Sequence, residues 1–393
     1  SRRAGAIAPF HVMRLLERAR ELEAAGRDVI HMEIGEPDFP TPLPVVEAAQ
    51  KALVDGRTHY TAARGLPALR EAVAAYYADH YGVPLDPDRI LITPGASGGL
   101  QLLLSALLDP GDGVLMADPG YPCNRHLVQL LGGVVHPVEV GPETGYQLTA
   151  DLVEASWRPG VRVVMVASPS NPTGTLLDAR EMARLHAAVL ARGGVLLVDE
   201  IYQGLVYDGG DRTALACGED GMFVVNSFSK YFGMTGWRLG WVVVPAGVAE
   251  TLDRLAQNLY LCAPTLSQYA ALAAFAPETR GMLEERRKRF RERRDYLLPA
   301  LEALGFRFSV RPEGAFYLYA DCSAVTADST EFAAALLDTR AVAVTPGVDF
   351  GAHEPRRHLR FAYTTGVERL REGVARIGRF LADGPESGTG PRS

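Results

Sequence analysis

Short apolar segments alternate with amphipathic segments through the first two thirds of the chain. Six segments contain an apolar run of strand length that ends in small or turn-forming residues. None of these runs alternates cleanly between apolar and polar positions. The segments lie at 89–95, 113–120, 161–174, 193–202, 222–230 and 240–245. Such runs are typical of strands buried on both faces of a largely parallel sheet. Helical patterns lie between them, at 97–108 and 178–194. This alternation predicts an α/β fold with a mostly parallel central sheet flanked by helices.

The pattern changes from about residue 257 onward. Two helical patterns, at 266–276 and 280–305, are followed by strand-like segments at 306–322 and 342–351 and by an amphipathic helix at 367–382. These segments predict a smaller α+β domain. We therefore expect three parts. Residues 1–39 form an N-terminal arm that is part of the small domain, residues 40–285 form a large α/β domain, and residues 286–393 form a small C-terminal domain.

Composition excludes several classes of function. The 393 residues are 47% hydrophobic and 22% charged with a formal net charge of −7, so no overall basic field favours nucleic acid. The arginine-dense segment 280–305 is interrupted by acidic residues and is typical of a solvated helix face. No apolar run approaches the ~18 residues of a membrane span, and the N-terminal arginines precede no apolar core of an export signal. We expect neither nucleic acid nor membrane as a partner.

The four cysteines are far apart and form no CxxC pair. A disulfide framework or zinc site is not expected, and a reducing compartment, the cytoplasm, fits better. The segment from His353 to His358 superficially resembles a zinc protease motif, but its two histidines are five residues apart and Pro355 would interrupt the helix that must align them. We therefore expect no metal site.

Polar residues follow several of the apolar runs. Asp199 comes directly after one strand, Asn171 and Ser97 follow two others, and Ser227 and Lys230 follow a fourth. In an open parallel sheet, ligands bind beyond the carboxyl ends of the strands, so one edge can gather these residues. Each alone has an ordinary explanation: a helix cap, a turn or a surface lysine.

Four segments taken together are more specific. The segments "IGEPDFPTP" at 34–42, "SPSNPTG" at 168–174, "VDEIY" at 198–202 and "SFSKYFGMTGWRLGW" at 227–241 resemble those of the class I/II aminotransferases, which are pyridoxal 5′-phosphate enzymes of fold type I, the aspartate aminotransferase fold. The resemblance covers nearly the whole chain. It implies a homodimer that moves an amino group from an L-amino acid to a 2-oxo acid, with 2-oxoglutarate as the expected acceptor, by a ping-pong mechanism.

The resemblance assigns roles around the cofactor ring. Lys230 is the lysine that forms a Schiff base with the cofactor aldehyde and then carries the proton; its apolar and cationic surroundings lower an amine's pKa. Asp199 keeps the pyridine nitrogen protonated, so that the ring can act as an electron sink. Asn171 and Tyr202 hydrogen-bond the phenolic oxygen, and Tyr121 stacks on the ring.

Other residues match the family's phosphate ligands. Ala96 and Ser97 open a helix, whose N-terminal amides and dipole favour an anion. Ser227, Ser229 and Arg238 complete this set, and arginine suits the role because its guanidinium can bind two oxygens.

Further matches concern the partner subunit and the substrate. Tyr60 resembles the tyrosine that reaches the phosphate from the other subunit. Arg360 resembles the arginine that binds the substrate's α-carboxylate, assisted by Asn171 and by the backbone of Gly35, where the missing Cβ allows close approach. Because Arg360 and Gly35 lie outside the large domain, the smaller domain is expected to close on substrate.

The same cofactor residues leave other reactions open. The alternatives are a C–S lyase that performs β-elimination and an enzyme that forms cyclopropane amino acids. A non-catalytic sensor joined to a DNA-binding module is disfavoured, because about thirty residues precede the first matching segment. The amino donor is open as well. Some bacterial aspartate aminotransferases carry a lysine where Ser97 stands, and neither Arg14 nor Arg125 clearly supplies a second arginine for an acidic side chain.

Overall fold

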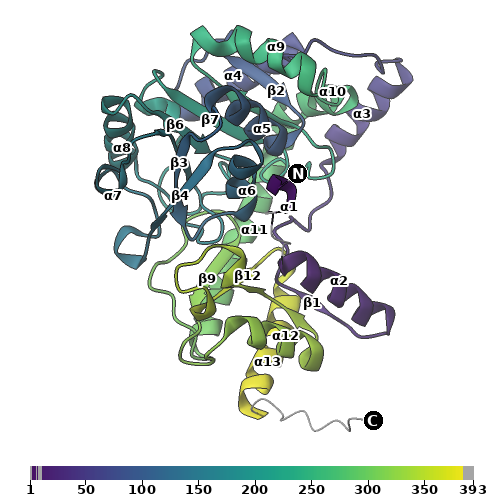
Figure 1. Ribbon diagram of the computed structural model, residues 1–393. Coiled ribbons are helices and arrows are strands. Elements are labelled where there is room, and N and C mark those ends of the chain that lie inside the picture. The colour runs from purple at the N-terminus through teal and green to yellow at the C-terminus, as the bar shows by residue number, and fades with distance from the viewer. Residues whose placement is uncertain (1, 6, 8–10, 384–393) are drawn as a thin grey trace. The chain divides into compact units, whose positions relative to one another are not determined.

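The chain forms two compact units in the computed structural model, which describes residues 2–5, 7 and 11–383 (Figure 1). Of these residues, the first unit contains 2–5, 7, 39–289 and 312–315, and the second contains 11–38, 290–311 and 316–383. The domain boundaries expected from the sequence, at 39/40 and 285/286, stay a prediction.

A seven-stranded sheet forms the centre of the described part of the first unit, in the order β2-β8-β7-β6-β5-β3-β4. Only β8 runs in the direction opposite to the other strands. Every position of β2, β7 and β8 is buried, which explains the lack of alternation in these sequences. The prediction of a mostly parallel, buried sheet is confirmed. The strands are β2 (Ile90–Thr93), β3 (Gly113–Asp118), β4 (Val134–Glu139), β5 (Val161–Ala167), β6 (Val195–Asp199), β7 (Met222–Ser227) and β8 (Gly240–Val243).

Helices flank this sheet. Helix α5 approaches the sheet closely at Gly99, where an added Cβ would lie 2.8 Å from a methyl group of Val242 and 3.1 Å from one of Val225. Glycine there lets α5 pack on β7 and β8, which fixes the helix N-terminus near the ends of these strands. The α-helices of this unit are α1 (Arg2–Gly5), α3 (Leu43–Val54), α4 (Pro67–Tyr81), α5 (Gly95–Leu107), α6 (Pro122–Leu130), α7 (Ala150–Ser156), α8 (Ala179–Ala191), α9 (Ala249–Leu259) and α10 (Thr265–Leu272). The 3₁₀ helices are η1 (Pro87–Arg89), η2 (Pro142–Thr144), η3 (Ala214–Cys217), η4 (Ala246–Val248) and η5 (Ala273–Phe275).

The arginine-dense helix α11 (Pro277–Glu302) passes from the first unit to the second. Its charges pair along the exposed surface one turn apart, as in the 2.6 Å contact between Lys288 and Glu285. Such pairs are typical of a solvated helix face. Within the part of the chain that the structure describes, neither this helix nor any other is long and apolar enough to cross a membrane.

The second unit is a smaller α+β structure, as predicted. Strand β1 (Ile30–His31) pairs in parallel with β10 (Val342–Ala343), and an antiparallel sheet has the order β11-β12-β9. Apolar residues of α2, α12 and the β1 segment form a core. The remaining elements are α2 (His11–Ala24), β9 (Tyr317–Asp321), α12 (Ser329–Arg340), β11 (Thr345–Pro346), η6 (Gly347–Asp349), η7 (Pro355–Arg357), β12 (His358–Ala362) and α13 (Val367–Asp383).

Candidate active site

Three of the predicted cofactor residues lie at neighbouring strand ends in the first unit. Asp199 is the last residue of β6 and pairs in register with Ala167 of β5 and Val225 of β7. Lys230 follows β7 by three residues, and its amine lies 6.0 Å from the centre of the Tyr202 ring. The parallel arrangement thus brings the amine of one segment close to a carboxylate and a phenol of another.

The Asp199 carboxylate is buried, and burial raises its pKa to about 6. A backbone N–H donated by Ile201 at 3.1 Å, a side-chain hydrogen bond with Asn124 and the charge of Lys230 act in the opposite direction. A carboxylate in such a position gains more from a cationic partner than it would in water. The site therefore suits a protonated ring nitrogen.

Beside these strand ends lies a cavity whose lining includes Tyr121, Asn124 and Asn171. Asn171 and Asn124 are buried, whereas Tyr121 is 37% exposed. Asn124, the hydrogen-bond partner of Asp199, was missed in the sequence. The signal that could have found it is its spacing: it follows Tyr121 by three residues, one turn along α6.

The N-terminus of α5 meets the predicted arginine. If Gly95 carried a Cβ, it would lie 2.6 Å from Nη2 of Arg238, so the guanidinium lies across the start of this helix. A Cβ at Gly240 would lie 2.8 Å from the carbonyl carbon of Gly95 and 2.9 Å from the amide nitrogen of Ala96. Both glycines permit close packing here. The first turn of α5, with Ala96 and the exposed Ser97, and Arg238 form an anion-binding arrangement.

The two predicted serines are buried and linked to each other. Ser227 Oγ lies 2.9 Å from Ser229 Oγ and 3.1 Å from the carbonyl oxygen of Leu239, and the Ser229 amide donates to Ser227 Oγ at 3.0 Å. These contacts tie the loop after β7 to the residue before β8. Contact of either hydroxyl with a phosphate stays a prediction.

This donor set fits pyridoxal 5′-phosphate. The cofactor needs an amine for its aldehyde, a carboxylate for its ring nitrogen and an anion site for its phosphate. Lys230, Asp199 and the start of α5 with Arg238 supply these groups within one unit.

Two of the three predicted substrate-binding residues, Arg360 and Gly35, share a neighbour in the second unit, whereas Asn171 belongs to the first unit. The Arg360 guanidinium lies 4.3 Å from the ring centre of Tyr317 and 4.9 Å from that of Phe350. A Cβ at Gly35 would lie only 1.8 Å from the Tyr317 hydroxyl oxygen. The glycine is therefore required by a contact inside the protein, a reason that the sequence did not reveal.

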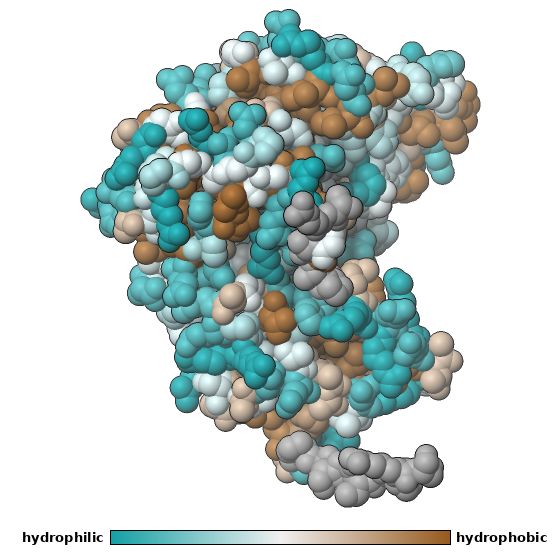
Figure 2. Space-filling model, viewed as in Figure 1, coloured by the Kyte–Doolittle hydropathy of each residue, from teal (hydrophilic) through white to brown (hydrophobic). Residues whose placement is uncertain are grey.

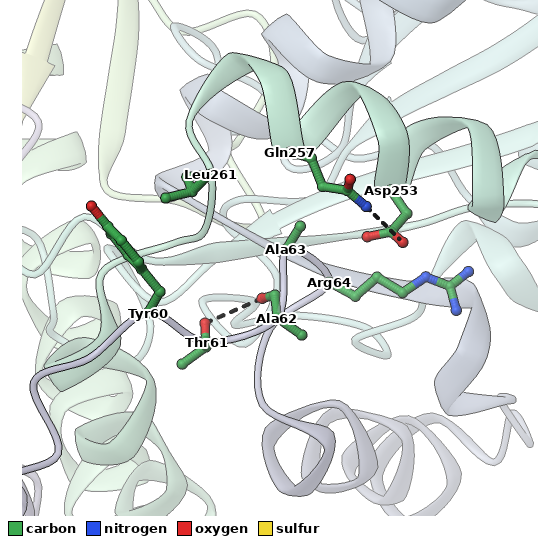
Figure 3. Close-up of a pocket in the computed structure, with 8 residues that line it drawn as sticks. All are labelled: Tyr60, Thr61, Ala62, Ala63, Arg64, Asp253, Gln257 and Leu261. Atoms are coloured by element: carbon green, nitrogen blue, oxygen red, sulfur yellow. Dashed lines mark hydrogen bonds between the residues drawn. The ribbon is translucent and has the colours of Figure 1, made fainter.

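Tyr60 is 81% exposed and lines a groove of about 420 Å³ in the first unit (Figure 3). Tyr60 and Leu261 lie at one end of the groove, and Arg64 and Asp253 lie at the other. The tyrosine is thus presented on a surface, where a second chain could reach it.

His358, one of the two histidines considered as a metal motif, packs against an aromatic ring. The His358 ring stacks on Tyr319 at 4.6 Å between ring centres, and its Nδ1 lies 3.1 Å from the carbonyl oxygen of Glu354. Among residues 2–5, 7 and 11–383, no group of three or more His, Cys, Asp or Glu side chains is arranged to hold a metal ion.

Comparison with known proteins gives consistent results. The family model for aminotransferase class I and II matches residues 27–377. The valine–pyruvate aminotransferase of Mycobacterium tuberculosis is 40% identical over 380 residues, which cover 96% of this chain and 97% of that protein. The aspartate/prephenate aminotransferase of Thermus thermophilus is 36% identical, with coverages of 97% and 98%.

The fold agrees as well. The crystal structure of an aminotransferase from Mycobacterium tuberculosis matches with a TM-score of 0.94 and 39% identity over 98% of this chain and 99% of the other. The sequence match and the fold match each extend over nearly the full chain. This chain therefore belongs to the class I and II aminotransferases, pyridoxal 5′-phosphate enzymes of the aspartate aminotransferase fold.

Proposed function

We propose that this aminotransferase moves an amino group from an L-amino acid to a 2-oxo acid, with 2-oxoglutarate as acceptor, in two half-reactions on one cofactor. The observation that carries the proposal is the placement of Lys230 and Asp199 at adjacent strand ends of the buried sheet. When bound, pyridoxal phosphate supplies an aldehyde that accepts the amino group and a ring that withdraws electrons from the substrate α-carbon.

Lys230 holds the cofactor and then moves a proton at the substrate α-carbon as general base and acid. The buried carboxylate of Asp199 holds the ring nitrogen in its protonated form. Asn171 and Tyr202, both buried, donate hydrogen bonds to the phenolic oxygen, and Tyr121 stacks on the ring. These groups fix the plane of the ring, so that the proton moves at a defined face.

The phosphate binds at the start of α5. The amide of Ala96 and the hydroxyl of Ser97 donate to it, and Arg238 adds a charged donor beside the helix. Ser227 and Ser229 complete the set after a change in their mutual hydrogen bond. In the second unit, Arg360 binds the substrate's α-carboxylate, and this interaction is assisted by Asn171 and the backbone of Gly35.

Borohydride reduction followed by peptide mapping tests the assignment of the lysine. The chain has three lysines, and Lys51 and Lys288 have side chains that are 76% and 59% exposed. We expect the reduced cofactor on Lys230 alone, and Lys230→Ala to abolish turnover while the matched Lys51→Ala variant keeps it. Label on either exposed lysine, or normal turnover by Lys230→Ala, would refute the proposal.

We propose a neutral amino donor such as valine. The support is the valine–pyruvate activity of the Mycobacterium relative and the serine at position 97, where some aspartate enzymes carry lysine. A panel of donors, scored by conversion of the bound cofactor to its amine form, should rank valine above aspartate; the opposite ranking would contradict this. Parallel assays with 2-oxoglutarate and pyruvate decide the acceptor, and pyruvate release from cystathionine without a 2-oxo acid would instead indicate a lyase.

We also propose a homodimer in which Tyr60 reaches the phosphate in the partner subunit. Figure 2 shows apolar side chains gathered at the upper right, over the part of the first unit where Figure 1 labels α3, α9 and α10. The exposed apolar residues of α3, of α9 and of the segment after α9 include Leu53, Val54, Leu259 and Leu261. Exposed apolar groups of this extent are typical of a surface that a partner covers.

Mixing two inactive variants tests the shared site. A dimer of one Lys230→Ala chain and one Tyr60→Ala chain has one site with both residues intact if Tyr60 acts across the interface. Refolding an equal mixture should restore about a quarter of wild-type activity, because half of the dimers are mixed and each has one intact site of two. No recovery in mixed dimers, or a monomer by light scattering, would contradict the proposal.

A cytoplasmic location is proposed from the cysteines. Cys123, Cys217, Cys262 and Cys322 are free in the structure, as expected in a reducing compartment. When cells are lysed in a buffer that contains an alkylating agent, all four thiols should become blocked, and titration of the denatured protein should then find no free thiol. A recovered disulfide would speak against this location.

A further inference from the structure

The carbonyl group of Glu33 lies at the centre of the contacts around Arg360. It accepts hydrogen bonds from Nη2 of Arg360 and, at 3.1 Å, from Oγ1 of Thr345. The same Thr345 oxygen lies 3.3 Å from Nη2 of Arg360, so carbonyl, hydroxyl and guanidinium form a closed triangle. All three groups are buried.

The two aromatic rings and this triangle constrain the guanidinium in different ways. Tyr317 and Phe350, at 4.3 and 4.9 Å, contact the guanidinium through weakly directional forces. Hydrogen bonds depend strongly on direction. The carbonyl and the hydroxyl therefore contribute directionally to which edge of the Arg360 guanidinium points toward a bound carboxylate.

The chain segment that carries this carbonyl is held on both sides. The carbonyl oxygen of Met32 accepts from the Ala362 amide at 2.7 Å, and that of Ile34 accepts from Oγ1 of Thr364 at 2.9 Å. Three consecutive carbonyls thus have partners from different segments of the second unit. The position of the Glu33 carbonyl is set by this network.

The Glu33 side chain anchors the same segment from the inside. The residue is fully buried, and its Oε1 lies 2.7 Å from Nδ1 of His31, two residues earlier in the chain. Among the described residues its Oε2 has no hydrogen-bond partner. On the outer side of the ring, Nε2 of His31 lies 3.1 Å from Glu23. A buried ion pair with an unsatisfied oxygen is a poor source of stability, so a positioning role is a better explanation for it.

We propose that Thr345 and the His31–Glu33 pair are positioning residues for amino-acid substrates, because they fix the carbonyl that orients the Arg360 guanidinium toward the substrate carboxylate. The proposal rests on the proposed role of Arg360 as the carboxylate-binding residue. It assigns functions to side chains that do not touch the substrate. These residues act on substrate affinity, while Lys230 and Asp199 act on the chemical step.

The test compares threonine variants in the holoenzyme. Thr345→Val keeps the shape but removes the hydroxyl, and we expect KM for the amino donor and the inhibition constant for isovalerate, a carboxylate without an amino group, to rise about 10-fold. The value of kcat should stay within about 2-fold, and the visible spectrum of the bound cofactor should not change. Thr345→Ser restores the hydroxyl and should recover most of the affinity for isovalerate.

A second pair of variants guards against a folding defect at the buried threonine. Glu33→Gln removes the charge of the inner partner of His31 and should raise KM several-fold, whereas Glu23→Gln, on the outer side of the same histidine, should leave it unchanged. Wild-type KM in both Thr345→Val and Glu33→Gln would overturn the inference, as would equal effects of Glu33→Gln and Glu23→Gln. An Arg360→Lys variant separates failure of the positioning proposal from failure of the proposed role of Arg360. If this variant too keeps the wild-type KM, the proposed role of Arg360 in carboxylate binding fails, and not only its positioning.

Discussion

Replacing Asp199 by asparagine should stabilise the protein without cofactor and impair the enzyme with it. The carboxylate is buried at the end of β6, and burial raises its pKa from 3.8 to about 6. The folded cofactor-free protein therefore binds this proton more tightly than the unfolded chain does. Between these two values, stability of the wild type falls as the pH rises.

The size of the effect follows from the shift. A rise in pKa from 3.8 to about 6 corresponds to about 3 kcal/mol of unfolding free energy. The wild type retains this free energy well below pH 4 and has lost it in full above pH 6. Asp199→Asn carries no charge and avoids this cost. The variant should gain little at pH 4 and up to about 3 kcal/mol at pH 8. Asparagine cannot hold the ring nitrogen in its protonated form, so kcat of the loaded variant should fall about 100-fold or more.

Urea unfolding of the cofactor-free proteins at pH 4, 6 and 8 measures the difference. Glu200, the next residue, is buried and titrates in both proteins, so its contribution cancels apart from the smaller effect of the Asp199 charge on it. Asp79→Asn, on the exposed side of α4, is the matched control and should change little at any pH. A gain from Asp199→Asn that is independent of pH, or a loss at pH 8, would refute the electrostatic reasoning.

Three further outcomes are expected. Burial raises the pKa of Glu200 to about 8, so Glu200→Gln should stabilise the cofactor-free protein in urea unfolding increasingly from pH 5 to 9; a constant difference would contradict this. Gly240→Ala places a Cβ within 2.9 Å of backbone atoms at the start of α5 and should weaken cofactor binding at least 10-fold in a spectroscopic titration, while Gly247→Ala, with open space, should not. Gly35→Ala should raise the KM for amino acids because of the 1.8 Å approach to the Tyr317 hydroxyl, and adding Tyr317→Phe should relieve part of the defect; equal KM values in the single and double variants would contradict this.

Much of the fold could be predicted because buried strands leave a simple signal. All residues of β2, β7 and β8 are buried and most are apolar, and a period of two is absent from such strands. The antiparallel direction of β8 was not predicted, since direction depends on pairing and not on the composition of one strand. The short strands β1, β10 and β11, of two residues each, lie below the length at which a pattern can be recognised.

The residues of the candidate site could be predicted where they directly follow a strand. Asp199 and Lys230 each follow an apolar run, and the geometry of a parallel sheet then places them at one edge. Asn124 was missed because it lies in a helix and not at a strand end and acts through Asp199, so that only its spacing of three residues from Tyr121 could have indicated it.

The second unit shows where sequence alone could have been taken further. In the segment "VIHMEIG", the polar residues His31 and Glu33 are two apart, and a strand places such residues on the same side. A charged residue between apolar neighbours in a strand requires a partner, and the histidine two residues earlier is the first candidate. The pairing was therefore accessible from the sequence. Its consequence for Arg360 was not, because the Glu33 carbonyl that binds this arginine is a backbone group, and only the folded chain shows which side chains its backbone orients.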